Sequence, residues 1–130
     1  MTAPAPAPAP ARVSFAALNI DCTDADALAG FWGKALGRPV SPGKVAGDTA
    51  VDTAGPESGP RMIFHTVPEV DTATNGFRPV LVTEYYADEL DRLTGLGAKP
   101  VDEVSLPELR WTTLTDPAGN EFDLVTLLQV

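Results

Sequence analysis

The chain repeats one order of predicted secondary structure, and this internal duplication limits the folds that it can adopt. Residues 15–28 read FAALNIDCTDADAL and residues 77–90 read FRPVLVTEYYADEL, so Phe, Ala, Asp and Leu recur at matching places. Each passage begins as a predicted strand and continues as a predicted helix. After each helix a Pro-Val step, at 39–40 and at 100–101, opens the next strand. The sequence therefore predicts two copies of a strand-helix-strand-strand-strand unit.

The first predicted helix has one apolar face and signals at both ends. Its apolar residues follow the spacing of a single buried stripe, which comprises Leu28, Phe31, Trp32, Ala35 and Leu36. Thr23 with Asp26 three residues later resembles a capping box, and Gly37 is placed to end the helix. We expect the indole of Trp32 to lie in the core.

The remaining elements follow from similar patterns. Tyr86, Leu90 and Leu93 form a second helical stripe that is expected to stop at Gly97. Strands are predicted over residues 13–20, 61–67, 77–83, 101–104, 109–115 and 122–128, with short extended pieces near Val40 and over 50–53, and a turn over 116–120. Pro79 cannot donate a ladder hydrogen bond and must lie at an edge or a bulge. A unit of about fifty residues is too small to bury a core alone, so the copies are expected to pack together.

The beginning of the chain differs from the rest. Residues 3–10 alternate Ala and Pro, and this pattern favours an extended polyproline II conformation. We expect a disordered Ala-Pro tail over residues 1–11, which is either a spacer or docking arm or an extension without a role of its own. One domain is expected over 12–130, with module one at 13–70 and module two at 76–130.

Net charge excludes several classes of function. Nine Lys and Arg against eighteen Asp and Glu give a formal net charge of −9, which repels phosphate backbones and anionic membrane surfaces. Nucleic acid and membranes are therefore not expected partners, and a cationic or neutral small molecule is easier to accept. No apolar run reaches the roughly 18 residues that span a bilayer, so a cytoplasmic protein is expected.

The counts of cysteine and histidine exclude further kinds of site. Cys22 is the only cysteine and His65 the only histidine of the chain. An intrachain disulfide, a Cys/His zinc cluster and an iron site with two histidines from this chain are therefore impossible. No Lys, Arg or His adjoins Cys22 in sequence, so we expect an unreactive thiol.

The duplicated unit, with FWGKALG in the first helix and RWTTLTDPAGNEFDLV near the C-terminus, resembles the glyoxalase/bleomycin-resistance family. This family is also called the vicinal oxygen chelate superfamily, and more narrowly the chain resembles the small glyoxalase-like proteins of high-GC bacteria. The resemblance covers about residues 13–130. It implies an α+β fold in which two βαβββ modules form a cupped mixed β-sheet with the helices packed outside. Relatives commonly pair their chains, so a homodimer is expected.

The resemblance also locates the family's metal ligands, which lie on the first and last strands of each module. On the first strand of module one, Ala16 and Ala17 stand where a His, Gln or Glu would be needed. On the first strand of module two, Arg78 stands where a His is usual, and a protonated guanidinium offers no lone pair. Both first strands therefore lack a metal-binding residue at the family's ligand position.

The last strands retain at most two ligands. Asp123 is at the usual position of a Glu, and the remaining position falls at Phe64 or His65. Catalytic Zn, Ni or Fe normally needs three protein ligands. We therefore predict neither a metal site nor another cofactor.

The same positions supply the candidate functional residues. His65 could act as a general acid or base, or it could be a hydrogen-bonded or surface histidine. Arg78 and Asp123 either form an ion pair, or Asp123 orients or deprotonates a substrate. The three are our catalytic candidates. The ligand-binding candidates are Trp111, Phe64, Phe77, Tyr85 and Arg110.

Three functions remain open, and the first is slightly favoured over the second; no sequence feature supports the third, a regulatory or structural partner protein. In the first, a drug-binding or ligand-carrying protein holds a small organic molecule, aromatic or cationic, in a cup without metal. In the second, a metal-independent isomerase, lyase or cyclase of secondary metabolism uses Asp123 or His65 as acid or base. Convergence of His65, Arg78 and Asp123 would favour an enzyme, and an aromatic-walled trough without an acid or base would favour binding.

Overall fold

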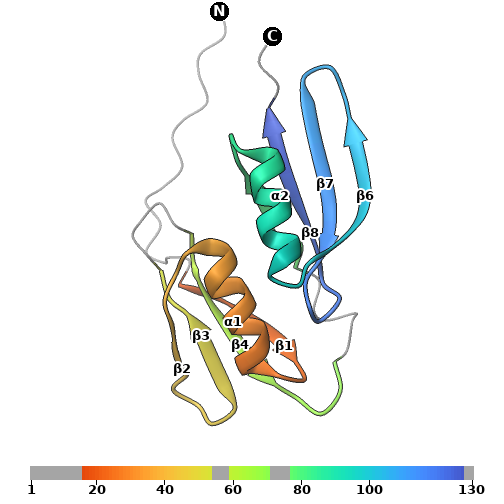
Figure 1. Ribbon diagram of the computed structural model, residues 1–130. Coiled ribbons are helices and arrows are strands. Elements are labelled where there is room, and N and C mark those ends of the chain that lie inside the picture. Colours follow the sequence, from red (N-terminus) through yellow and green to blue (C-terminus); the bar gives the residue numbers. More distant parts are fainter. Residues whose placement is uncertain (1–15, 54–58, 71–76, 128–130) are drawn as a thin grey trace, which may run out of the picture.

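The computed structural model describes residues 16–53, 59–70 and 77–127, which form two βαβββ modules (Figure 1). Module one contains β1 (Ala17–Cys22), α1 (Ala25–Leu36), β2 (Val40–Pro42), β3 (Asp48–Val51) and β4 (Arg61–Thr66). Module two contains β5 (Val80–Val82), α2 (Tyr86–Gly95), β6 (Lys99–Ser105), β7 (Leu109–Thr115) and β8 (Glu121–Leu127). The predicted duplication is confirmed, and the Ala-Pro tail lies outside the described residues.

Each module builds its own four-stranded mixed sheet. The strand orders are β1-β4-β3-β2 and β5-β8-β7-β6, with the first and last strands of each module paired in parallel. The α+β class and the two modules are confirmed, but the hydrogen bonds form two sheets rather than one continuous cup. Within the described residues, β1 and β5 are therefore sheet edges.

The two faces of each sheet differ in burial. In Figure 1 both helices lie on the same side of their sheets. The residues that face the helices form the core, as Phe64 on β4 and Phe122 on β8 illustrate, both with 0% exposure. Side chains alternate along a strand, so His65 and Asp123 lie on the opposite side. We call this opposite side of each sheet its outer face.

Helix α1 begins at a different cap from the predicted one. Asp24, not Thr23, is the N-cap, and its carboxylate accepts a hydrogen bond from the Ala27 N–H at 3.1 Å. The carboxylate of Asp26 instead accepts a hydrogen bond from the hydroxyl of Thr49 on β3. The capping-box expectation was therefore wrong, because Asp26 binds a neighbouring strand rather than the start of its own helix.

Trp32 joins the cores of the two modules, as its predicted burial required. Its side chain is fully buried, and its ring centroid lies 5.3 Å from Phe31, 6.4 Å from Phe77 and 4.9 Å from Phe122. Its indole N–H donates to the carboxylate of Asp116 at 3.0 Å. Trp32 therefore anchors module one on module two through both aromatic packing and a hydrogen bond.

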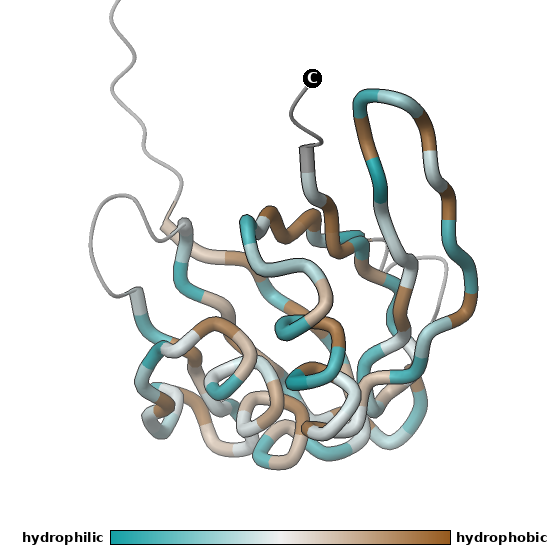
Figure 2. The backbone as a smooth tube through the Cα atoms, turned by 45° about the horizontal axis from the view of Figure 1, so that its top comes forward, coloured by the Kyte–Doolittle hydropathy of each residue, from teal (hydrophilic) through white to brown (hydrophobic). Residues whose placement is uncertain are grey.

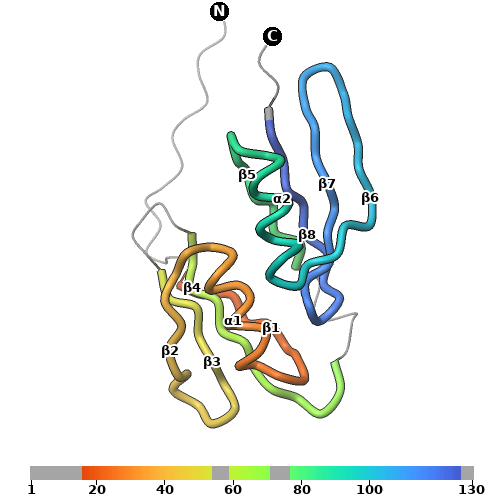
Figure 3. The backbone as a smooth tube through the Cα atoms, viewed as in Figure 1, coloured from red at the N-terminus to blue at the C-terminus, as the bar shows by residue number. Residues whose placement is uncertain are grey.

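Module two has a short first strand and a long hairpin. The predicted strand over 77–83 is reduced to β5, which lies behind α2 in Figure 3. Pro79 precedes it at the sheet edge, where its carbonyl accepts from the Asp123 N–H at 3.0 Å. The hairpin of β6 and β7 extends beyond the helices, with alternating hydrophobic and hydrophilic residues (Figure 2).

Candidate functional site

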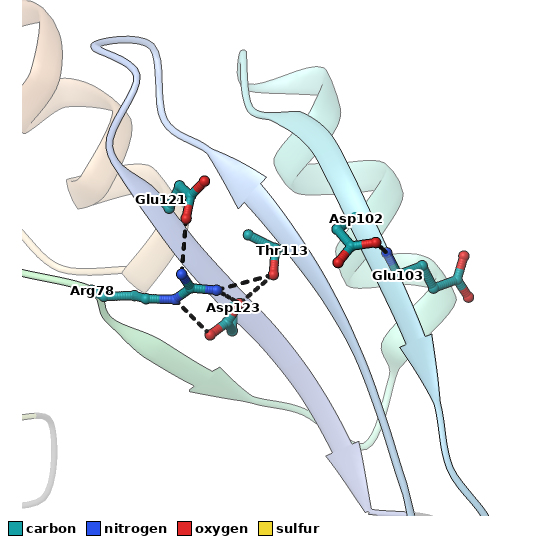
Figure 4. A network of polar contacts seen from close by, with 6 residues as sticks. All are labelled: Arg78, Asp102, Glu103, Thr113, Glu121 and Asp123. Carbon is teal, nitrogen blue, oxygen red and sulfur yellow. Dashed lines mark hydrogen bonds and ion pairs between the residues drawn. The ribbon is translucent and has the colours of Figure 1, made fainter.

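Arg78 and Asp123 form a two-bond ion pair on the outer face of module two (Figure 4). The Nε and Nη2 atoms of Arg78 donate to the two carboxylate oxygens of Asp123, each at 3.0 Å. The Thr113 hydroxyl donates to Asp123 at 2.6 Å and accepts from Nη2 of Arg78 at 3.2 Å. The remaining terminal nitrogen, Nη1, donates to Glu121 at 2.8 Å. Of the two alternatives for Arg78 and Asp123, the structure contains the ion pair.

The strand register brings these side chains together. Thr113 on β7 lies opposite Asp123 on β8, and Val80 on β5 lies opposite Asp123 on its other side. Arg78 precedes Val80 by two residues and therefore reaches the same face of the sheet. The network thus spans the beginning of module two and its last two strands.

The ion pair fixes the charges of both partners. The hydrogen bond from Arg78 lowers the pKa of Asp123 despite the opposing effect of partial burial, and the bond from Thr113 lowers it further. The hydrogen bond to Asp123 raises the pKa of Arg78. A general base works best with a pKa near the operating pH, and both oxygens of Asp123 are already engaged. Asp123 is therefore poorly suited to take a proton from a substrate.

His65 belongs to a different network, on the outer face of module one. Its Nδ1 bonds the carboxylate of Asp48 on β3, and Asp21 on β1 lies opposite His65 in the other pairing. The hydrogen bond to Asp48 is the main cause that raises the pKa of His65. Among the described residues, no hydrogen bond or ion pair joins His65 to Arg78 or Asp123.

Two of the predicted ligand-binding residues have side chains that point away from the outer face. Phe64 is fully buried in the core on the helix side of β4, so His65 is the residue that reaches the outer face. Arg110 lies on the helix side of β7, where it bonds Glu103 at 2.7 Å and places its guanidinium 4.6 Å from the Tyr86 ring centroid. Strand alternation points both side chains away from Asp123, so neither is available for a ligand on the outer face.

The other three aromatic candidates keep accessible surface. Trp111 is half-buried on the outer face of β7, opposite Val125. Tyr85 is 67% exposed at the start of α2. Phe77 is half-buried and lines two separate cavities between the modules.

The larger cavity, of about 680 Å³, has an acidic lining. Module one contributes the ends of β1 and β4 with Asp21 and Glu69, and module two contributes the β7–β8 turn with Asn120 and Glu121. Phe77 forms an apolar part of the wall, and no Lys or Arg is among the described residues that line it. We call this space the acidic cavity.

The smaller cavity, of about 290 Å³, has a mainly apolar lining. Leu18, Trp32 and Leu81 are among its walls, and Phe77 separates it from the acidic cavity. Of the described residues that line it, only two arginines carry charge. We call this space the apolar groove.

Sequence reasoning missed the carboxylates of the acidic cavity. Asp21 directly follows the strand predicted over residues 13–20, and Asp21, Glu69 and Glu121 were not among the predicted site residues. Each lies at or near a strand end, which is where loops of two packed modules meet. That position was the available signal, but the sequence does not say which loops become neighbours.

The residues at the family's metal positions do not fit a metal ion. Ala17 has no donor atom, Arg78 is a cation, and both oxygens of Asp123 accept hydrogen bonds. Within the described ranges, no cluster of three His, Cys, Asp or Glu side chains could hold a metal ion. These residues therefore do not support a reaction step that uses a bound metal ion.

Two βαβββ modules packed around a shared core define the class of fold, and a comparison of the sequence with family models identifies the family. Residues 17–125 match the glyoxalase-like domain family, and the chain therefore belongs to it. The predicted relationship to the glyoxalase/bleomycin-resistance superfamily is confirmed. A search of curated proteins gave no match.

Solved structures of low sequence identity share the fold. A glyoxalase/bleomycin resistance protein/dioxygenase family enzyme from Burkholderia phytofirmans PsJN is 15% identical with a TM-score of 0.69, over 89% of this chain and 100% of that one. UcmS2 is 23% identical with a TM-score of 0.63, over 88% and 98%. TioX from Micromonospora sp. ML1 is 17% identical with a TM-score of 0.61, over 89% and 100%. At these identities the likeness shows the fold alone.

The first prediction concerns the coupling of Arg78 and Asp123. Arg78→Ala leaves a partly buried carboxylate without its main partner, so the melting temperature should fall by about 5 °C. Adding Asp123→Ala should restore part of this loss, and thermal unfolding of the two single variants and the double variant measures the coupling. The exposed pair Arg110 and Glu103 is the matched control and should show weaker coupling. Additive losses at Arg78 and Asp123 would contradict the ion pair.

The second prediction concerns metal content. Because the family's ligand positions hold unsuitable residues, the purified protein should carry less than about a tenth of an equivalent of transition metal. EDTA should leave its melting temperature unchanged. Stoichiometric Ni, Zn or Fe by elemental analysis would overturn the interpretation of these positions.

The third prediction is a pH dependence of stability. The pKa of His65 is raised in the folded protein, chiefly by its bond with Asp48. The protonated imidazole therefore stabilises the fold in full below the unfolded pKa of about 6.5, and this stabilisation is lost as the pH rises through the folded pKa. The stability difference between the wild type and His65→Gln should therefore grow from about pH 8.5 to about pH 5.5. Urea unfolding at each pH measures it, and a difference that is constant with pH would contradict the pairing.

Proposed function

We propose that the protein binds a small organic cation in the acidic cavity without a metal, as a ligand-binding or ligand-carrying protein. The observation that carries the proposal is the lining of this cavity, in which Asp21, Glu69 and Glu121 surround an aromatic wall formed by Phe77. Its volume of about 680 Å³ falls within the range of ligand pockets, roughly 300–1,000 Å³. Carboxylates favour a positive ligand, and an aromatic face favours a flat or cationic one.

The arrangement of the polar candidates supports binding over catalysis. Asp123 is held by Arg78 on module two, whereas His65 is held by Asp48 on module one. Burial is the main cause that raises the pKa of the Cys22 thiol, which also lines the acidic cavity, so this thiol is a weak nucleophile. These side chains do not form a single acid-base constellation.

A metal-independent isomerase, lyase or cyclase remains the second candidate, and one observation favours it. His65 lies opposite Asp21 in the strand register, and Asp21 lines the acidic cavity. An imidazole next to the cavity could transfer a proton to or from a bound substrate. In that case His65, not Asp123, is the acid or base.

A dye-binding titration tests the proposed function. Thioflavin T, a flat aromatic cation, should bind with a micromolar Kd, whereas the aromatic anion ANS should bind at least about tenfold more weakly. The double variant Asp21→Asn/Glu69→Gln should lose about tenfold in affinity for the cation.

The matched control is Asp88→Asn/Asp91→Asn, which removes the same charge from the exposed face of α2. Its affinity for thioflavin T should stay within about twofold of the wild type, because distant surface charge is screened by salt. Equal losses in the two double variants would mean that the cation responds to net charge alone. The binding proposal would then fail.

We also propose that two chains pair as a homodimer in the cytoplasm, and we expect no nucleic-acid partner. The support is the set of open sheet edges in the described residues, which includes β1 and β5, together with Val80 and Val82, which are 66% and 75% exposed on β5. No helix in the described residues is long and apolar enough to cross a membrane.

The fourth prediction is therefore the mass in solution. Light scattering at micromolar concentration should give about twice the chain mass of 13.6 kDa, because unpaired strand edges and exposed valines favour association. A charged residue on the edge strand, Val82→Lys, should shift the mass toward the monomer. A wild-type mass near 13.6 kDa would refute the dimer.

A further inference from the structure

We propose that Glu121 is the carboxylate that anchors the bound cation, and that Arg78 competes with the ligand for it. This inference rests on the proposed function, because it assigns a role within the acidic cavity. Among the described residues, Glu121 is the one partner of Arg78 that also lines this cavity. It therefore connects the ion-pair network on the outer face with the space between the modules.

A ligand could replace Arg78 as the partner of Glu121. The contact between Glu121 and Arg78 consists of one bond of 2.8 Å, from Nη1 of Arg78 to one carboxylate oxygen, and the two side chains are 52% and 50% exposed. Ion pairs with this exposure stabilise a fold little, because water solvates both partners well. A ligand in the cavity can therefore replace Arg78 at Glu121 without much loss of stability.

The contact between Asp123 and Arg78 is of a different kind. Asp123 is only 16% exposed, accepts two bonds from the guanidinium and a third from Thr113. Arg78 therefore remains held by Asp123 when Glu121 turns to a ligand. The network has one fixed carboxylate and one exchangeable carboxylate, and the exchangeable one faces the cavity.

The same geometry indicates the chemical class of the ligand. Glu121 already accepts a charge-assisted N–H bond from a guanidinium nitrogen at 2.8 Å. A ligand that replaces this nitrogen must bring both positive charge and an N–H donor. An aromatic amidinium or a protonated aromatic amine meets both requirements, and its flat body can pack against Phe77 in the same cavity.

The test uses the fluorescent aromatic diamidine DAPI, which carries N–H donors, beside thioflavin T, which carries none. The wild type should bind DAPI more tightly than thioflavin T. Glu121→Gln should weaken the binding of DAPI at least about tenfold and the binding of thioflavin T at most about threefold. Glu103→Gln is the matched control, because Glu103 is a 53% exposed carboxylate paired with a single arginine on the other face of the sheet. It should change neither Kd by more than about twofold.

A second variant tests the competition. Arg78→Met/Asp123→Asn leaves the net charge unchanged and removes the competitor of the ligand, so the affinity for DAPI should rise about threefold or more. Arg110→Met/Glu103→Gln is its charge-neutral control and should leave the affinity unchanged. Melting curves establish that each variant is folded at the temperature of the titration.

The outcomes separate the two proposals. If the wild type binds neither dye, the proposed function fails. If the wild type binds both dyes but Glu121→Gln behaves like Glu103→Gln, the cavity binds cations and the role of Glu121 is overturned. If Arg78→Met/Asp123→Asn is folded but binds DAPI more weakly than the wild type, Arg78 helps binding and the proposed competition is overturned.

Discussion

One buried carboxylate, that of Asp116, ties the two modules together. Asp116 is only 3% exposed, and it accepts hydrogen bonds from the Trp32 indole, the Ala118 N–H, and the N–H and side-chain amide of Asn120, at 2.9 to 3.0 Å. A buried carboxylate without such donors would strongly destabilise the fold. Helix α1 of module one is thereby tied to the β7–β8 turn of module two. The same turn forms one wall of the acidic cavity, so the packing of the modules and the shape of the cavity depend on the same contact.

At the family's metal position on module two, an ion pair with a supporting hydroxyl takes the place of a metal site. Arg78 supplies positive charge where a metal ion would supply it, and Asp123 and Thr113 remain satisfied by it. This exchange lowers the pKa of Asp123 and removes it from acid-base chemistry. The polar residues at these positions therefore satisfy one another, and the nearby cavity keeps its own carboxylates.

The sequence could predict those features that depend on local pattern. The helical stripe placed Trp32 in the core, and the resemblance to the family placed Arg78 and Asp123 at two of its metal-ligand positions. It could not decide between Phe64 and His65, because a shift of one residue along a strand reverses the face of every side chain. Arg110 was misplaced for the same reason, since it adjoins Trp111 on β7 but points to the other side. The acidic cavity was missed because it forms only when loops of separate modules meet.

Phe77 connects the electrostatics of the site with its apolar surface. It lies at the beginning of module two, packs against Trp32, and lines both the acidic cavity and the apolar groove. On one side of its ring the described lining carries Asp21, Glu69 and Glu121, and on the other it is mainly aliphatic. A ligand with a positive end and a flat apolar body matches this change of lining better than a uniformly polar one. Arg78 follows Phe77 directly in the chain, and alternation along an extended segment points the two side chains to opposite sides. The residue that lines both spaces and the residue that we propose competes for Glu121 are therefore neighbours in the chain.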